Sequence, residues 1–198
     1  MSLLDEFVSA LSNQHQLDLD KLLGFILAKA RRATVAEAGS IFFAQPVLGE
    51  RGDCMLTCLS LQNDRIKLDA ASFSVPIDTT SIAGYVATTG EVLEIDDLYN
   101  LPPDKPFRFN RTFDDKHGYR STSMLAFPLK NVHNEVVGVV QLINHLEGLD
   151  KEGKPLYKPF KLQHVDDMKS LMVVLGMVAE RTALVSEVAR LKKLAGVK

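Results

Sequence analysis

The longest regular pattern in the chain is a helical repeat that runs from residue 161 to about residue 193. Apolar or small residues recur there at alternating steps of three and four, which is the spacing of a heptad seam. At 1.5 Å per residue such a helix is about 45 Å long, which exceeds the roughly 30 Å span of a small domain. We therefore expect part of this helix to project from the domain body. The seam consists of Met168, Leu171, Leu175, Val178, Thr182, Val185 and Ala189.

The projecting part of this helix needs a partner that covers its apolar seam. The partner we expect is the same helix of a second copy, which would make the protein a homodimer through its terminal helices. The alternative is a helix that folds back along its own sheet. The sequence pattern alone leaves both arrangements open.

Two further helices are expected at the start of the chain. Ser2 followed by Asp5 is typical of a helix cap and predicts a short amphipathic helix within residues 1–16. A second helix begins at a cap at Asp18, and Gly39 stands at a position that predicts its end. The apolar stripe of the first helix is Leu3, Leu4, Phe7, Val8 and Leu11, and that of the second is Leu22, Ile26, Ala30 and Ala33.

Between these helices, short apolar or alternating runs divided by turn-rich pieces predict strands. Residues 131–134 form a loop short enough for an antiparallel hairpin. Ser81 and Gly90 bracket a small helix as its cap and its stop. The order of these helices and strands along the chain predicts an α+β fold, in which one antiparallel sheet carries helices on one face. The expected strands are residues 40–45, 54–61, 92–95, 123–130 and 135–144.

The overall charge gives no sign of a polyanionic partner. The 23 basic and 25 acidic side chains leave a net charge of -2, so nothing points to nucleic acid or an anionic membrane. No apolar run approaches the roughly 18 residues that a spanning helix needs, and the N-terminus is acidic where a signal peptide is basic. We expect a cytoplasmic protein that contacts neither nucleic acid nor a membrane.

Motifs of catalysis and metal binding are missing from the sequence. The histidines stand far apart, and there is no glycine-rich phosphate loop or nucleophile elbow. We expect no metal, no cofactor and no catalytic residue. Adjacent carboxylates such as Asp96-Asp97 and Asp114-Asp115 are interpreted as solvated turns or helix caps. Cys54 and Cys58, four apart on one strand, would lie about 13 Å from each other, too far for a disulfide.

An irregular stretch from residue 96 to 122 combines aromatic rings with basic side chains. A loop of this length inside a compact domain is usually functional or disordered, and its aromatic content argues against disorder. The rings could stack on a base while the charges neutralise a phosphate. Alternatively, the rings plug the open side of the sheet and the charges face water. The aromatics are Tyr99, Phe107, Phe109, Phe113 and Tyr119, and the basic residues are Lys105, Arg108, Arg111, Lys116 and Arg120.

Several runs of residues, in order, resemble the core of a GAF domain, especially the GAF domains of cyclic-nucleotide phosphodiesterases and adenylyl cyclases. The first half of the resemblance is Val75-Pro76-Ile77, Ser81-Ile82-Ala83-Gly84-Tyr85-Val86-Ala87-Thr88-Thr89-Gly90-Glu91 and Ile95-Asp96-Asp97. The second half is Arg108-Phe109-Asn110, Gly118-Tyr119-Arg120, Ser123 to Leu129 and Gly138 to Asn144. The resemblance covers about residues 17 to 185.

The resemblance implies a six-stranded antiparallel sheet with N- and C-terminal helices on one face and a ligand pocket on the other. In that family the start of a helix faces the cyclic phosphate of the ligand and an aromatic ring packs on the purine. It also implies a dimer through the terminal helices. By resemblance, the pocket residues are Ser81, Ile82, Ala83, Phe109, Asn110, Phe113, Tyr119, Ser121 and Thr122.

The sequence departs from the cyclic-nucleotide subfamily at one motif. That subfamily pairs Asn-Lys after the last strand with a later Phe-x-x-x-Asp-Glu, whereas here Asn144 is followed by His145 and Phe160 precedes Asp166-Asp167. We expect the lysine salt bridge either to be lost or to be replaced by a weaker, pH-dependent contact between His145 and Asp167. The family's free methionine sulfoxide reductases need three cysteines, and this chain has two.

The sequence as a whole predicts a regulatory domain from a larger bacterial signalling protein. Its expected parts are an N-terminal helix at 1–16, a GAF domain at 17–160 and a C-terminal helix at 161–198 that dimerises and signals. The expected function is a sensor of a small molecule, with a cyclic nucleotide as one candidate. The alternative is a ligand-free dimerisation module whose pocket is closed by its own aromatic rings.

Overall fold

The computed structural model describes residues 19–46, 54–66 and 73–195. The helix expected at 1–16 and the cap expected at Asp18 lie outside these residues.

One curled antiparallel sheet forms the centre of the described chain, as predicted. Its six-strand path runs β3-β2-β1-β6-β5-β4, and a seventh short strand, β7, pairs with the far end of β6. The long central strands β1 and β6 pair directly, from Ala36 opposite His145 to Phe43 opposite Gly138. The strands are β1 (Ala36–Pro46), β2 (Cys54–Asn63), β3 (Ser74–Pro76), β4 (Leu93–Ile95), β5 (Met124–Lys130), β6 (Val136–Leu149) and β7 (Pro155–Lys158).

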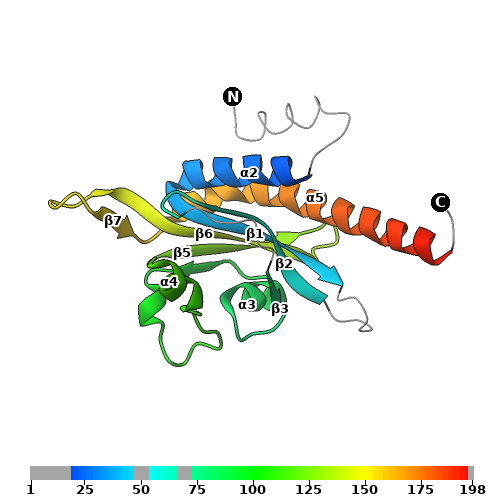
Figure 1. Ribbon diagram of the computed structural model, residues 1–198, viewed down its shortest axis with the longest axis horizontal. Coiled ribbons are helices and arrows are strands. Elements are labelled where there is room, and N and C mark those ends of the chain that lie inside the picture. Colours follow the sequence, from blue (N-terminus) through cyan, green and yellow to red (C-terminus); the bar gives the residue numbers. More distant parts are fainter. Residues whose placement is uncertain (1–18, 47–53, 67–72, 196–198) are drawn as a thin grey trace.

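Two long helices, α2 (Leu19–Thr34) and α5 (Leu162–Leu194), lie side by side on one face of the sheet (Figure 1). Their apolar stripes pack on Ala36, Ile41 and Phe43 of β1 and on β5 and β6. This arrangement confirms the predicted α+β layering. The fully buried side chains of this layer include Leu23, Ile26, Leu27, Leu125, Leu142 and Met168.

The end of α2 is the main error of the sequence prediction. The helix ends at Thr34, well before Gly39, because Val35 adopts a left-handed conformation with φ of 49° and turns the chain into β1. The segment from Ala36 then pairs with β2 on one side and with β6 on the other. Pairing on both edges outweighs the modest helix preference of its alanines.

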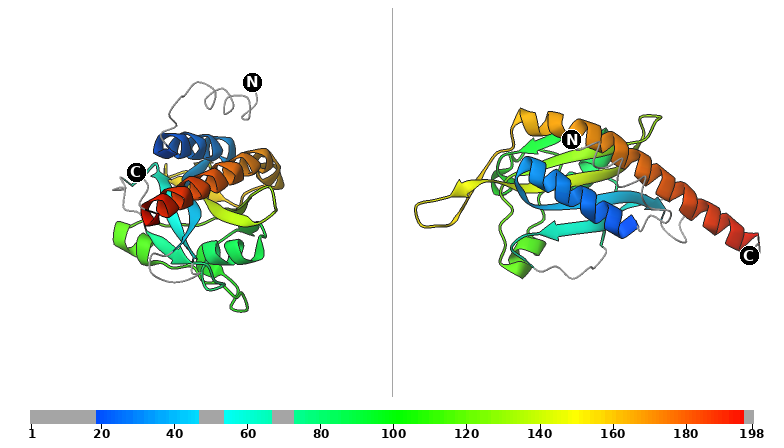
Figure 2. Two further views of the ribbon diagram at one scale, coloured as in Figure 1. Left: turned by 90° about the vertical axis from the view of Figure 1, so that its right-hand side faces the viewer. Right: turned by 90° about the horizontal axis from the view of Figure 1, so that it is seen from above.

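The seam predicted for the last helix divides into two parts in the structure. Met168, Leu171 and Leu175 are buried against the sheet, so the first part is covered within the chain itself. The second part of α5 extends beyond the ends of the strands (Figure 2). Val185, from the projecting part of the predicted seam, is exposed there.

The elements that the described residues place on the opposite face of the sheet are short. These are α3 (Ile82–Thr89), the 3-10 turn η1 (Leu98–Asn100) and α4 (Thr112–His117). The last two lie inside the stretch that the sequence predicted to be irregular. A second apolar cluster fills the space between α3 and the sheet, and it includes Phe42, Leu56, Val86, Phe107 and Val139.

Candidate functional site

The start of α3 is fixed by a side-chain cap, as the sequence predicted. Ser81 has extended backbone angles, and its Oγ accepts a hydrogen bond from the Gly84 N–H at 3.0 Å. Gly84 itself must be a glycine, because a Cβ there would lie 2.4 Å from the Asp78 carbonyl oxygen. The helix ends at Gly90, which adopts the left-handed conformation. The cap and the tight turn place the first turn of α3 firmly against the sheet.

The turn before α3 is stabilised by a carboxylate and is joined to a distant segment. Asp78 accepts from the backbone N–H and the hydroxyl of Thr80, both at 2.8 Å, and these bonds lower the pKa of that carboxyl. The Arg108 N–H donates to the Thr80 carbonyl at 2.9 Å, and Ser81 forms a parallel bridge with Arg108. The start of α3 therefore lies beside the segment that contains Phe109.

Two aromatic pairs anchor the segment between η1 and α4. Phe107 is buried and packs edge-on against Tyr85 of α3, with ring centroids 5.0 Å apart. Phe109 is half-buried and lies 5.6 Å from Tyr99. These contacts agree with the interpretation in which the rings cover the open side of the sheet.

Asp114, in the first turn of α4, is a buried hub. Its oxygens accept from the Tyr99 hydroxyl at 2.9 Å and from the backbone N–H and hydroxyl of Ser121 at 2.7 Å and 2.9 Å. Asp114 is 1% exposed, so its interpretation as a solvated turn or cap was wrong. The reason is that the chain returns through Ser121 and supplies donors, which satisfy a carboxylate in the interior.

Glu37 is a second buried hub, near the end of the sheet. Its carboxylate accepts from the Tyr119 hydroxyl at 2.7 Å, from the Asn144 side-chain amide at 3.2 Å and from the Tyr157 hydroxyl. Burial, followed by the bond to Glu37, raises the pKa of Tyr119, and the same two causes raise the pKa of Tyr157 to about 12. Both phenols therefore stay neutral donors at neutral pH.

Eight of the nine residues predicted to line the pocket form two groups. Ser81, Ile82 and Ala83 form the start of α3, and Phe109 follows Arg108, which is bridged to Ser81. Phe113, Tyr119, Ser121 and Thr122 lie around the two carboxylate hubs, where Phe113 and Tyr119 rings are 6.3 Å apart and Thr122 donates to Asn144. Asn110 is exposed and accepts from the Thr112 N–H at the start of α4.

Tyr99 joins these two groups, since it contacts Phe109 through its ring and Asp114 through its hydroxyl. The guanidinium carbons of Arg111 and Arg120 lie 4.4 Å and 4.1 Å from its ring centroid. Sequence reasoning missed Glu37, Asp114 and Asn144 as members of this region. Their partners are up to 120 positions away in the sequence, so no local pattern indicates them.

The first turn of α3 offers hydrogen-bond donors to a ligand. Ile82 and Ala83 are buried, at 4% and 5% exposure. Among the contacts of the described residues, their backbone N–H groups have no acceptor, since the cap satisfies only Gly84. Buried N–H groups are normally satisfied by protein or by a bound molecule, and a helix start favours an anion.

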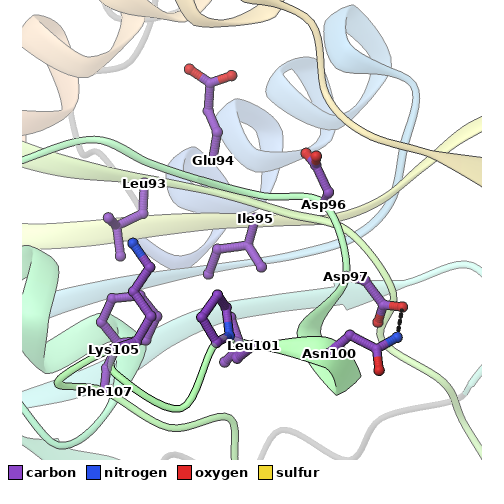
Figure 3. A pocket seen from close by; sticks show the side chains of 10 residues that line it. Leu93, Glu94, Ile95, Asp96, Asp97, Asn100, Leu101, Lys105 and Phe107 are labelled. Atoms are coloured by element: carbon purple, nitrogen blue, oxygen red, sulfur yellow. Dashed lines mark hydrogen bonds between the residues drawn. The ribbon is translucent and has the colours of Figure 1, made fainter.

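A separate cavity of about 320 Å³ lies beside the edge strand β4 (Figure 3). None of the nine predicted residues lines it, and the sequence prediction did not anticipate it. Its lining is formed by Leu93, Glu94, Ile95, Asp96, Asp97, Asn100, Leu101, Pro102, Lys105 and Phe107.

The histidine that follows Asn144 lies between the end of α2 and the start of α5. The His145 Nδ1 lies 2.8 Å from the Thr34 carbonyl oxygen, and its ring lies 4.6 Å from that of His164 and 5.6 Å from that of Phe160. The side chain of Asp167 lies outside the described part, so a contact between it and His145 stays a prediction. In this structure His145 ties the end of α2 to the start of α5.

A metal centre and a membrane-spanning helix each require features that can be looked for among the described residues. No group of three or more His, Cys, Asp or Glu side chains there is arranged to hold a metal ion. Among the helices of those residues, none combines the length and apolar character that crossing a membrane requires.

Comparisons with known proteins point to one family. The family model described as GAF domain matches residues 18–180. A cGMP-specific 3',5'-cyclic phosphodiesterase of Drosophila mojavensis is 31% identical over 140 residues, which are 68% of this chain and 12% of the phosphodiesterase. The chain therefore corresponds to about an eighth of the length of that curated relative.

Solved structures show the same fold at lower identity. The GAF domain of an Acinetobacter phosphoenolpyruvate-protein phosphotransferase superposes with a TM-score of 0.63 at 16% identity, covering 93% of this chain and 94% of that domain. A segment of a methyl-accepting chemotaxis protein superposes with a TM-score of 0.61 at 18% identity, covering 92% and 98% of the two chains.

Proposed function

The chain belongs to the GAF domain family, a family of regulatory domains found in cGMP phosphodiesterases and other signalling proteins, and on that premise we propose that it is a sensor that binds a small anionic ligand. The proposed ligand is a cyclic nucleotide, held between the sheet and the short elements α3 and α4. The proposed site residues are the nine named from the resemblance. The segment itself is proposed to regulate rather than catalyse, in a cytoplasmic protein.

The observation that carries this proposal is the pair of buried N–H groups at Ile82 and Ala83. They have no acceptor among the described residues, and they lie at the positive end of α3. Phe109 lies in the segment that is bridged to this helix start, so an aromatic ring and anion-binding donors are close together. A phosphate with an attached purine matches that combination.

The phosphate contact can be tested by removing one N–H group without disturbing the helix. Ser81 has ψ of 158°, which suits a residue before proline, and proline is tolerated at the first helical position. The variant Ile82→Pro deletes the donor, and Ile82→Val is the matched control that trims the side chain but keeps the donor. Binding of cyclic AMP and cyclic GMP is measured by calorimetry and by the amide signals of Ile82 and Ala83.

The expected result is binding of one of the two nucleotides that Ile82→Pro weakens by about tenfold or more, since a hydrogen bond to a charged group contributes about 1.5–3 kcal/mol. Ile82→Val should bind as the wild type does. If neither nucleotide gives heat or moves the two amide signals, the cyclic-nucleotide proposal is wrong.

A ligand-free dimerisation module is the second candidate, and a specific observation favours it. The hydroxyls of Tyr119 and Ser121, two of the proposed ligand contacts, already donate to Glu37 and Asp114. A thermal-shift screen of small metabolites separates the candidates, because a ligand that binds only the folded state raises the melting temperature.

The proposed signal path and dimer seam run along the projecting part of α5. An outward stripe there is spaced by steps of seven, four and three, and its side chains are 50–61% exposed. A ligand would change the arrangement of a helix pair by preferring one of its packings. The stripe consists of Met177, Leu184, Val188 and Leu191.

The dimer can be tested by placing charges in this stripe. Leu184→Glu together with Val188→Glu should convert a dimer to a monomer in analytical ultracentrifugation, and the far-UV spectrum should stay unchanged. Leu175 is unsuitable for this test, because it is fully buried against the sheet and its replacement by a charge would unfold the domain. Sedimentation of the wild type as a monomer would refute the proposed dimer.

A further inference from the structure

One wall of the cavity beside β4 is apolar, whereas the rest of its lining is polar. Leu93 and Ile95 project from the same side of β4, as alternation in a strand requires, and face Leu101 and Phe107 of the following loop (Figure 3). Its volume of about 320 Å³ lies at the lower end of the range of about 300–1,000 Å³ for small-molecule sites. The cavity therefore suits a compact apolar body.

The loop that forms the outer wall is held in place from within. The Arg108 guanidinium donates to three carbonyl oxygens of the loop, those of Lys105, Phe107 and Pro103, the last two at 2.9 Å and 3.1 Å. Phe107 is buried and packs on Tyr85 of α3. Because the wall is anchored, little conformational entropy would be lost when a ligand enters.

The charged side chains around the cavity differ in whether they can pair with a ligand. Asp97 already accepts from the Tyr99 N–H at 2.9 Å and from the Asn100 side-chain amide at 2.6 Å. The carboxylates of Glu94 and Asp96 point to the opposite side of β4, away from the apolar side chains (Figure 3). Lys105 extends from the loop toward β4, and among the described residues its ammonium has no partner.

We propose that this cavity is a second ligand site, distinct from the site at the start of α3, and that it takes a small amphipathic carboxylate. The apolar body lies among Leu93, Ile95, Leu101 and Phe107, and the carboxylate pairs with the Lys105 ammonium. The cavity wall continues through Arg108 into the turn before α3.

Three probes with one apolar body test the proposal: 3-phenylpropionate, 3-phenylpropionamide and 3-phenylpropylamine. Each is titrated into methyl-labelled protein and followed by NMR. The methyl signals of Leu93, Ile95 and Leu101 should shift with saturation, and those of Ile82 should not. The carboxylate should bind up to about fivefold more tightly than the amide, which is the size expected for an exposed ion pair, and the amine should bind most weakly.

Two variants assign the charge preference to one residue. Lys105→Gln should bring the affinity for the carboxylate down to that for the amide, whereas Lys116→Gln, on the last turn of α4, should leave the difference intact. Equal affinity for carboxylate and amide in the wild type, tightest binding of the amine, or methyl shifts at Ile82 in place of Leu93 and Ile95 would each overturn the proposal. So would the absence of any methyl shift. None of these outcomes depends on cyclic-nucleotide binding.

Discussion

On one face of the sheet, α2 and α5 bury a continuous layer of large apolar side chains, whereas on the other face α3 and α4 are short and their loops are held by buried carboxylates. Apolar packing over long helices is non-directional and supplies most of the stability. Hydrogen bonds to Asp114 and Glu37 are directional and fix particular side chains. The helix-covered face therefore contributes mainly stability, whereas the face with directional contacts holds defined side-chain positions and is the one on which ligands are proposed to bind.

The largest expected effect is on the helix-covered face. Leu175→Ala deletes a fully buried side chain of α5, and the resulting cavity should lower the free energy of unfolding by about 3 kcal/mol. Val173→Ala, on the exposed side of the same helix, is the control and should change it by less than about 0.5 kcal/mol. Urea denaturation measures both. Equal losses would mean that the outer side of α5 is covered in solution.

The second prediction concerns the two cysteines of β2, one exposed and one buried in the cluster of the opposite face. Burial raises the pKa of the Cys58 thiol to about 11. Its thiolate fraction at pH 8 is then about a hundredfold below that of an ordinary cysteine. In the native protein a disulfide reagent should modify Cys54 quickly and Cys58 only after denaturation. The Cys54→Ser variant keeps only Cys58, and the Cys58→Ser variant keeps only Cys54. If the remaining cysteine reacted fast in both native variants, this face of the sheet would open readily.

The third prediction tests a hub of the directional face. Asp114→Asn keeps the shape of the side chain but replaces one acceptor by a donor, which leaves the Ser121 or Tyr99 donors unmatched. The free energy of unfolding should fall by about 2 kcal/mol. The neighbouring Asp115 is exposed, so Asp115→Asn should have little effect. If only Asp115→Asn lowered the free energy of unfolding, Asp114 would not be the residue that holds this region together.

The two faces also differ in how far the sequence predicts them. The stripe of α2, the first part of the stripe of α5 and the apolar runs of β2, β5 and β6 arise from local spacing, and the structure confirms them. The small helix from Ser81 to Gly90 was predicted for the same reason, because its cap and stop are local signals. For the long helices, the apolar stripe is sufficient for the prediction, because residues that recur with the helical period lie on the side that faces the core.

Elements that depend on distant partners could not be predicted in this way. The segment after Val35 resembles a helix end, and only its pairing with β2 and β6 makes it a strand. Asp114 resembles a solvated carboxylate until the chain returns through Ser121. The resemblance to the family indicated the start of α3 and the aromatic segment. It gave no indication of the Glu37 hub or of the cavity beside β4, because the side chains that form them are brought together only by the fold.

The smallest effect is expected at the start of α3, where local and distant contacts meet. Ser81→Ala removes the cap on the Gly84 N–H and should lower the free energy of unfolding by about 1 kcal/mol, whereas Ser81→Asp should retain the cap. Because the helix is short and held by the apolar cluster, the loss should appear first as faster hydrogen exchange of the α3 amides. Exchange that accelerates equally in α2 and α5 would show that the two faces unfold as one unit.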